Sequence, residues 1–324
     1  MAEDYSWLFD RPLDERGPGE PEGITERLQH RRVRRYRVKT IKSGDVLECE
    51  IYPIWDTKAE AGRARRAKTK EAQRRINVRN ARKRFCRLVN TNFAAGDLWL
   101  TLTYSGEQPD LEQARRDMQN YIRRVRTYRA RHGLPELKYA YVIEYMGDDG
   151  RRARVHHHII MSAMDRDAAE SLWGKGRANA DRLQPDDGGL TGVAMYMTKG
   201  VGAGGGQGTK RWAASRNLAK PIETVADHKV SKARVERLAR DIGEAKGIFE
   251  RLYRGYTYTD CKVTRSDFVA GAYIYVTMRR QVARGKGGKG GKGHGKGRAV
   301  HQSDCKSSTL DRRIDCCGRR HDGL

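Results

Sequence analysis

Apolar and polar residues alternate in three stretches near the middle of the chain. Residues 98–104 read LWLTLTY, with an apolar or aromatic side chain at every second position, and residues 139–145 and 155–161 show a similar alternation. A period of two is typical of a strand with one buried face. The Asp149-Gly150 pair between the last two stretches favours a β-hairpin. The sequence therefore predicts an antiparallel sheet in this region.

Helical spacing of apolar residues marks other stretches. In residues 110–132, Met118, Ile122 and Val125 recur at helical intervals, which predicts a helix with one buried side. Similar reasoning predicts further helices at 165–173, 190–199 and 231–254. The Gly-rich stretch 200–208 follows the third of these and predicts a mobile loop.

The predicted elements define a fold class and a domain organisation. Strands joined by hairpins, with helices between them, predict an α+β fold: an antiparallel sheet with helices packed on one face, a ferredoxin-like layer. A hairpin at 36–55, turning at Ser43-Gly44-Asp45, precedes this sheet, and a late strand covers 267–278. The predicted parts are a mostly disordered segment (1–35), a basic hairpin and helix packed on the central domain (36–97), the central domain (98–282) and a disordered Gly/Lys-rich tail (283–324).

The charge balance is strongly basic. Lys and Arg number 66 against 41 Asp and Glu, which gives a net charge of +25. Residues 284–303 contribute six of the positive charges and no acid, so the predicted folded part is itself basic. Such a surface attracts polyanions, either nucleic acid or an anionic membrane.

A membrane and an oxidising compartment are both disfavoured. No apolar run approaches the roughly 20 residues of a spanning helix. The N-terminal MAEDYSWLFD is acidic and lacks the apolar core of a secretory signal. Six cysteines are scattered without CxxC spacing, which indicates neither a disulfide framework nor a zinc ribbon. We therefore expect a cytoplasmic protein of a bacterial host cell that binds nucleic acid and no membrane.

Residues 58–93 predict a helix that is dense in positive charge, with 13 Lys and Arg against Glu60 and Glu71. A charge run is often a solvated helix face, but here the excess has one sign, which favours a helix that follows a phosphate backbone. The candidate DNA-binding residues are Arg74, Arg75, Arg79, Arg82, Lys83 and Arg84.

Three consecutive histidines fall on one of the predicted strands. Alternation places His156 and His158 on one face and turns His157 toward the apolar layer. Glu144 lies across the predicted hairpin among apolar residues, where a carboxylate is costly unless it is paired or bound to metal. Two neutral imidazoles and a carboxylate suit Mg²⁺ or Mn²⁺ presented to phosphate oxygens, and ligand type leaves Zn²⁺ open.

Tyr196, in the stretch AMYMTKG, is the candidate nucleophile. Lys199 follows at i+3, which predicts that both lie on one helix face. A phenol with a pKa of about 10 attacks phosphorus only when a metal and a cation polarise the phosphate. Thr101 and Thr103, on the strand face opposite the leucines, are further candidates for the site.

The order of these motifs resembles a known family. LTLTY (100–104), then Glu144 before the three histidines, then Tyr196-Met197-Thr198-Lys199 are similar to the three ordered motifs of HUH endonucleases. More narrowly, they resemble the rolling-circle replication initiators of phages and plasmids. The segment KRWAASRNLAKP (210–221) resembles the one that follows the tyrosine helix in phage-type members. The resemblance spans roughly residues 36–282.

The resemblance implies a role for each residue. His156 and His158 would be metal ligands with Glu144 as the third, Tyr196 would attack a DNA phosphate, and Lys199 would steady the phosphate or the metal site. The products would be a 5′-phosphotyrosine and a free 3′-hydroxyl, made by an enzyme of the single-tyrosine type. The implied DNA is single-stranded or locally melted origin DNA, with a host DNA polymerase as partner. Because no P-loop motif is present, we also expect a host helicase.

Two alternatives stay open. Conjugative relaxases and single-strand transposases use the same chemistry, and a matching nick-site hairpin on the same replicon would separate them from replication initiators. A non-catalytic nucleic-acid-binding repressor is the rival of another class, since Tyr139, Tyr141 and Tyr145 share one strand face and aromatic sheet faces bind bases. That face is opposite Glu144, which favours the core for these tyrosines.

Overall fold

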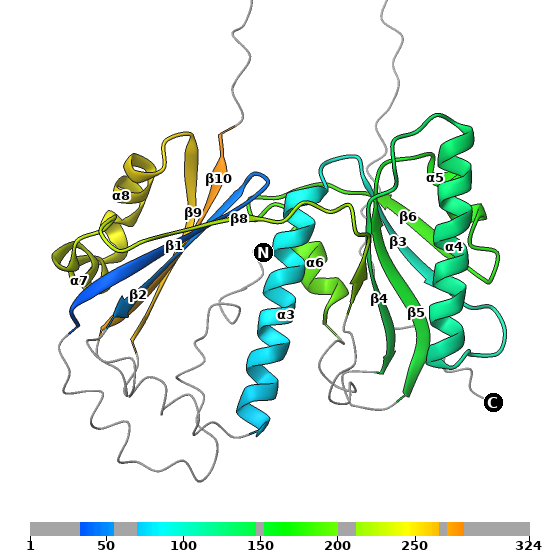
Figure 1. Ribbon diagram of the computed structural model, residues 1–324, viewed down its shortest axis with the longest axis horizontal. Helices are drawn as coiled ribbons and strands as arrows, with labels where there is room; N and C mark the ends of the chain where they lie inside the picture. The colour runs from blue at the N-terminus through cyan, green and yellow to red at the C-terminus, as the bar shows by residue number, and fades with distance from the viewer. Residues whose placement is uncertain (1–32, 55–69, 147–151, 200–211, 266–270, 282–324) are drawn as a thin grey trace, which may run out of the picture. The chain divides into compact units, whose positions relative to one another are not determined.

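The computed structural model describes residues 33–54, 70–146, 152–199, 212–265 and 271–281 (Figure 1). These residues form two antiparallel five-stranded sheets and six α-helices. The α+β class predicted from the sequence is therefore confirmed. Several predicted features lie outside the described residues: most of 1–35, residues 58–69 of the basic helix, the Asp149-Gly150 turn, the Gly-rich stretch 200–208 and the tail 283–324.

The first sheet, called the hairpin sheet, has the strand order β8-β1-β2-β10-β9. Its strands are β1 (Arg35–Ser43), β2 (Val46–Ile54), β8 (Ile222–Ala226), β9 (Tyr256–Arg265) and β10 (Ala272–Arg280). The predicted N-terminal hairpin is confirmed, since Ser43 pairs with Val46 across the turn. Gly44 in that turn has a φ of 60°, and a Cβ there would lie 2.1 Å from the carbonyl oxygen of Asn90. Both the backbone conformation and the close approach therefore require glycine.

Two helices, α7 (Lys232–Arg240) and α8 (Ala245–Leu252), pack on the apolar face of the hairpin sheet. The prediction of one helix over 231–254 is wrong. The chain is extended at Asp241, with a φ of −136° and a ψ of 109°, and its carboxylate accepts a hydrogen bond from Gly243 N–H at 2.8 Å. A side chain that bonds the local backbone and a glycine both oppose a continuous helix.

The second sheet, called the histidine sheet, has the strand order β6-β3-β5-β4-β7. Its strands are β3 (Leu98–Thr103), β4 (Tyr139–Met146), β5 (Arg152–Met161), β6 (Ala178–Arg182) and β7 (Ala213–Ala214). The three strands predicted in the middle of the chain are confirmed as β3, β4 and β5. Leu98, Leu100 and Leu102 are fully buried on one face, as the alternation predicted.

Helices pack on both faces of the histidine sheet. They are α3 (Lys70–Asn92), α4 (Leu111–Arg131), α5 (Arg166–Ser171) and α6 (Thr191–Met197). α4 and α5 lie on the side of the β3 leucines, around the buried Trp173 (Figure 1). α3 and α6 pack on the other side, where Phe85 and Val89 of α3 meet Ala194 of α6. The site described below lies on this second face.

The four strands that the sequence did not predict are β6, β7, β8 and β9, which are the edge strands of the two sheets. β8 is mostly exposed and β7 has two residues. In β9 a bulge interrupts the alternation, because Thr277 of β10 pairs with Asp260 and the adjacent Met278 pairs with Tyr258. The hairpin sheet thus draws strands from both sides of the predicted boundary at residues 97 and 98. None of the helices in the described ranges is long and apolar enough to cross a membrane.

Candidate metal and nucleophile site

Glu144, His156 and His158 meet on one face of the histidine sheet. Antiparallel pairing of β4 with β5 sets Glu144 opposite His156 and Val142 opposite His158. Directly opposed residues place their Cβ atoms about 5 Å apart, and diagonal neighbours lie within reach of long side chains. Strand register alone therefore brings the carboxylate and both imidazoles together, as the sequence predicted.

The three side chains present their ligand atoms to one point. Glu144 Oε2 lies 3.2 Å from His156 Nε2 and 3.6 Å from His158 Nε2. Each residue offers one ligand atom, and the three atoms all lie within 4.8 Å of one another. Atoms bound at about 2.1 Å to one ion lie roughly 3.0 to 3.5 Å apart. The cluster can therefore hold a divalent cation after small side-chain adjustments.

Each imidazole is oriented from its other nitrogen. His156 Nδ1 lies 3.0 Å from the carbonyl oxygen of Arg154, so this nitrogen donates and leaves the Nε2 lone pair for a cation. His158 Nδ1 lies 3.2 Å from the hydroxyl of Thr101 on β3, which can accept in the same way. Outer hydrogen bonds of this kind fix the tautomer and the ring orientation of metal-binding histidines. Thr101 therefore lies at the site, as predicted.

The carboxylate and the imidazoles stabilise each other's charged forms. Hydrogen bonds from His156, and then from His158, lower the pKa of Glu144 to about 2, and the bond to Glu144 raises the pKa of His156. Glu144 is therefore a carboxylate at any physiological pH. A cation bound here replaces the proton on His156, so metal binding is expected to release protons.

His157 points to the opposite face of the sheet, as the alternation predicted. It is fully buried, and its Nε2 lies 2.9 Å from the hydroxyl of Tyr104, within the apolar layer that includes Trp173. Burial lowers the pKa of His157 to about 3. His157 is therefore a neutral core residue and not part of the cluster of ligand atoms.

We expect His157 to make the fold sensitive to acid. Its folded pKa of about 3 lies below the unfolded value of about 6.5, so the unfolded chain takes up the proton first as pH falls. The contribution of neutral His157 to stability is complete above about pH 6.5 and is lost progressively below it. His157→Gln should be less stable than the wild type at pH 7, and this deficit should shrink by roughly 2 kcal/mol at pH 5. Denaturant unfolding at both pH values measures it, and a constant deficit contradicts the assignment.

Tyr196, on α6, places its ring against this cluster. The residue is 55% exposed, and its ring centroid lies 5.5 Å from that of His158 and 5.6 Å from that of Trp99, both in edge-to-face geometry. An exposed phenol beside potential metal ligands is accessible to a phosphate that contacts both. Trp99 was not among the candidate residues, although the β3 alternation had placed it on the same face as Thr101.

Lys199 and Thr103 lie nearby with different surroundings. Lys199 follows α6, and its N–H donates to the carbonyl oxygen of Tyr196 at 3.1 Å. Its side chain is exposed, one turn beyond the tyrosine. The hydroxyl of Thr103 donates to the carbonyl oxygen of Arg177 at 3.0 Å, so it is engaged with the neighbouring chain segment and not with the histidines.

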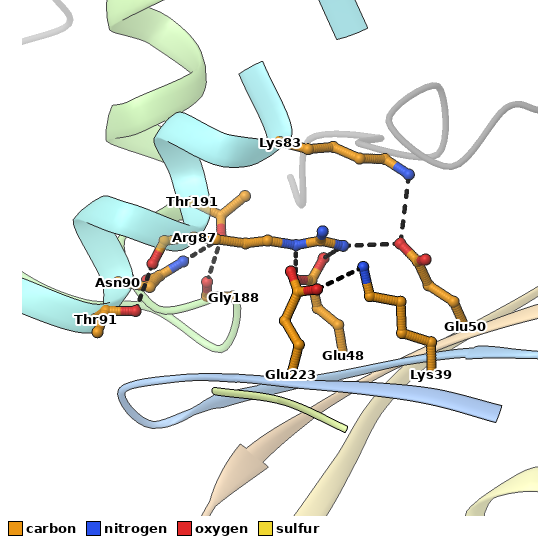
Figure 2. Close-up of polar contacts among 10 residues, drawn as sticks. All are labelled: Lys39, Glu48, Glu50, Lys83, Arg87, Asn90, Thr91, Gly188, Thr191 and Glu223. Atoms are coloured by element: carbon orange, nitrogen blue, oxygen red, sulfur yellow. Dashed lines mark hydrogen bonds and ion pairs between the residues drawn. The ribbon is translucent and has the colours of Figure 1, made fainter. Parts of the chain in front are cut away.

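Helix α3 fastens both ends of α6. The Asn90 side chain accepts a hydrogen bond from Leu190 N–H at 2.7 Å and donates to the hydroxyl of Thr191 at 2.9 Å (Figure 2). Beyond the other end, the Arg82 guanidinium donates to the carbonyl oxygen of Lys199 at 2.8 Å. These contacts satisfy backbone groups that a short helix leaves open. They also fix where α6 presents its tyrosine.

Charged side chains tie α3 to the hairpin sheet (Figure 2). Arg87 donates to Glu48 at 2.6 Å and to Glu50 at 2.7 Å, and the Lys83 ammonium lies 3.6 Å from Glu50. Burial opposes the ionisation of Glu50, yet Lys83 and Arg87 hold its pKa below the usual range. Loss of one partner in such a network leaves a buried charge uncompensated. The hairpin sheet therefore supports the helix that holds α6.

Asn90→Ala is expected to lower kcat for any reaction of Tyr196 by about tenfold, with little change in KM. The substitution removes the two hydrogen bonds at the start of α6, and misplacement of a reacting group lowers the rate of the chemical step. Asn92→Ala is the matched control, because Asn92 lies on the same helix and bonds Ala219 instead of α6. Equal losses of kcat in both variants would show a general effect on folding.

The predicted DNA-binding residues of α3 differ in their surroundings. Arg84 is exposed and Arg79 is partly exposed. Arg82 and Lys83 make the contacts described above. The side chains outside the described residues are those of Arg74 and Arg75. Contact of these six residues with DNA stays a prediction.

Comparison with known proteins points to the same region. A model of a family of replication-associated proteins, the ORF2 type, matches residues 97–201. The match runs from β3 to the end of α6 and contains Glu144, both outward histidines and Tyr196, whereas the hairpin sheet lies outside it. No curated protein and no solved structure matches the chain significantly. The histidine sheet is thus similar to replication-associated proteins and carries a cluster able to hold a divalent metal ion.

Proposed function

We propose that the protein is a replication initiator that nicks one strand of origin DNA through Tyr196 and a divalent metal ion. One observation carries the proposal. Two imidazole nitrogens and a carboxylate oxygen lie within 4.8 Å of one another, and the exposed ring of Tyr196 lies 5.5 Å from the ring of His158. The family match over the same residues supports replication as the setting.

The proposed reaction is a transesterification at a DNA phosphate. A bond forms between Tyr196 Oη and phosphorus while the bond from phosphorus to the 3′-oxygen breaks. The phenol loses its proton to solvent and the released 3′-oxygen takes one up, which leaves a 5′-phosphotyrosine and a free 3′-hydroxyl. When bound, Mg²⁺ or Mn²⁺ polarises the phosphate and stabilises the charge that develops on its oxygens.

The surrounding residues have defined parts in this proposal. Glu144, His156 and His158 hold the ion, and Thr101 orients His158. The edge-to-face contact with Trp99 restricts the ring of Tyr196. Lys199 supplies a cation to the phosphate as negative charge grows on it.

The DNA is proposed to approach along α3. Arg79 and Arg84 offer positive charge on the helix that fastens α6, so a strand bound there passes close to Tyr196. The proposed DNA is single-stranded or locally melted at the origin. A host helicase then opens the duplex and a host polymerase extends the 3′-hydroxyl.

The other functions considered fit less well. A relaxase or single-strand transposase would use the same residues, and the match to replication-associated proteins favours replication. A binding-only repressor needs no carboxylate turned toward two imidazoles. The tyrosines that suggested it, Tyr139, Tyr141 and Tyr145, pack against the core on the opposite face of the sheet.

The direct test is a cleavage assay with the purified chain. Overlapping single-stranded fragments of the replicon that encodes the protein are incubated with Mn²⁺ or Mg²⁺ and resolved under denaturing conditions. The expected result is one cleaved fragment, together with a protein band shifted by attached DNA, and EDTA should abolish both. Tight binding of a fragment without cleavage under any metal condition would support the repressor instead.

A further inference from the structure

A pocket of about 310 Å³ opens on the hairpin sheet, apart from the histidines and Tyr196. It lies where β1 and β8 meet the segment before α7 and the end of α8. Its size is at the lower end of the range for small-ligand sites, roughly 300 to 1,000 Å³. None of the residues that line it belongs to the metal cluster or lies within the region matched to replication-associated proteins.

Three cations line this pocket, and no carboxylate does. They are Lys42 on β1, Lys229 before α7 and Arg254 after α8. Among the described residues none of the three forms an ion pair, whereas Lys39 and Arg37 on the same strand β1 are paired with Glu223 and Asp227. Like charges gathered without a counter-charge repel one another, and an anion between them removes that repulsion.

Lys229 shows this most clearly. Its side chain is partly buried, and its ammonium lies 4.0 Å from the centroid of the Tyr253 ring. Burial lowers the pKa of Lys229, and the charge of Lys42 adds to this effect. The ring is itself fixed, because the Tyr253 hydroxyl lies 2.6 Å from that of Thr40. The ammonium is thus held at the pocket without a carboxylate to neutralise it.

We propose that this pocket binds a phosphate ester, either a phosphodiester of a DNA strand or the phosphate of a free nucleotide. Two ammonium groups and a guanidinium donate strong hydrogen bonds to phosphate oxygens, and the hydroxyl of Thr224 adds a neutral donor. Leu252 and Ile222, the latter 64% exposed, give the pocket an apolar wall for the neutral part of the ligand. The proposal is independent of nicking by Tyr196.

Calorimetry on the full chain in EDTA tests the proposal without strand cleavage. The probes are thymidine 5′-monophosphate and a short oligothymidylate, each titrated at several salt concentrations. The variant is Lys42→Gln with Lys229→Gln, and Lys246→Gln is the matched control, because Lys246 is exposed on α8 and does not line the pocket. Thermal unfolding confirms that each variant is folded, and Arg254→Gln replaces the double variant if it is not.

Each outcome has a defined meaning. If the pocket takes a DNA phosphodiester, the double variant binds the oligonucleotide at least about tenfold more weakly, and the log–log salt slope becomes shallower by roughly 1.4 for two lost contacts. If it takes a free nucleotide, the monophosphate loses affinity in the double variant and the oligonucleotide does not. Binding of both probes that is unchanged in the double variant, or no detectable binding to the wild type, overturns the proposal.

Discussion

Replacing His156 and His158 together with alanine is expected to reduce nicking by at least about 10³-fold. The substitution removes two of the three ligand atoms that lie around one point, and Glu144 alone offers a weak monodentate site. A metal ion contributes several kcal/mol to stabilising the charge on a reacting phosphate, and each 1.4 kcal/mol changes the rate tenfold. Single-turnover cleavage of the origin fragment under saturating Mn²⁺ measures the loss.

Two controls separate metal binding from folding. Thr101→Val removes the hydrogen-bond partner of His158 Nδ1 while it leaves all three ligand atoms. It should weaken metal affinity by about 10- to 100-fold, and high Mn²⁺ should restore the rate. The double alanine variant should keep its cooperative unfolding and its affinity for DNA. If it still nicks at the wild-type rate, the cluster has no part in the chemistry.

Tyr196→Phe is expected to abolish both cleavage and covalent attachment, a loss of at least roughly 10⁴-fold. The ring remains, so the edge-to-face contacts with Trp99 and His158 remain, and the attacking oxygen is the one atom removed. Affinity for origin DNA should stay within about twofold of the wild type, because exposed cations supply most of it. Gel-shift titration and a denaturing adduct assay measure the two quantities separately.

Tyr145→Phe is the matched control. Tyr145 is adjacent to Glu144 on β4, but it packs against the core on the opposite face of the sheet. It should therefore nick at close to the wild-type rate. An adduct formed by the Tyr196→Phe variant would assign the chemistry to another tyrosine.

The part of the site that follows from local patterns could be predicted. Alternation along a single strand separated His156 and His158 from His157, and the same rule placed Glu144 on the matching face of its neighbour. Both statements need only the period of a strand and antiparallel pairing across a hairpin. The buried leucines of β3 were found in the same way.

The parts that depend on distant pairing could not be predicted. β8 pairs with β1 across the length of the chain, although it is short, exposed and lacks a clear apolar face. The bulge between β9 and β10 hides the alternation of β9. Edge strands bury one side chain row at most, so their sequences carry little signal.

The supporting contacts of α6 were hidden for a related reason. Arg82 belongs to a run of basic residues, and nothing in that run shows that its guanidinium reaches the carbonyl oxygen of Lys199. Asn90 bonds residues a hundred positions away. Such roles arise only when α3 packs on α6, and the sequence pattern of α3 shows one charged helix.

The central claim is that Tyr196 becomes joined to DNA, and peptide mapping of the adduct tests it most directly. The wild-type protein is reacted with a single-stranded origin fragment and Mn²⁺, the DNA is digested to a residual nucleotide, and the protein is cleaved with a protease for mass spectrometry. The account predicts one modified peptide, with the nucleotide on Tyr196 through its 5′-phosphate. A nucleotide found on any other residue, or cleaved DNA that carries no protein at all, would contradict it.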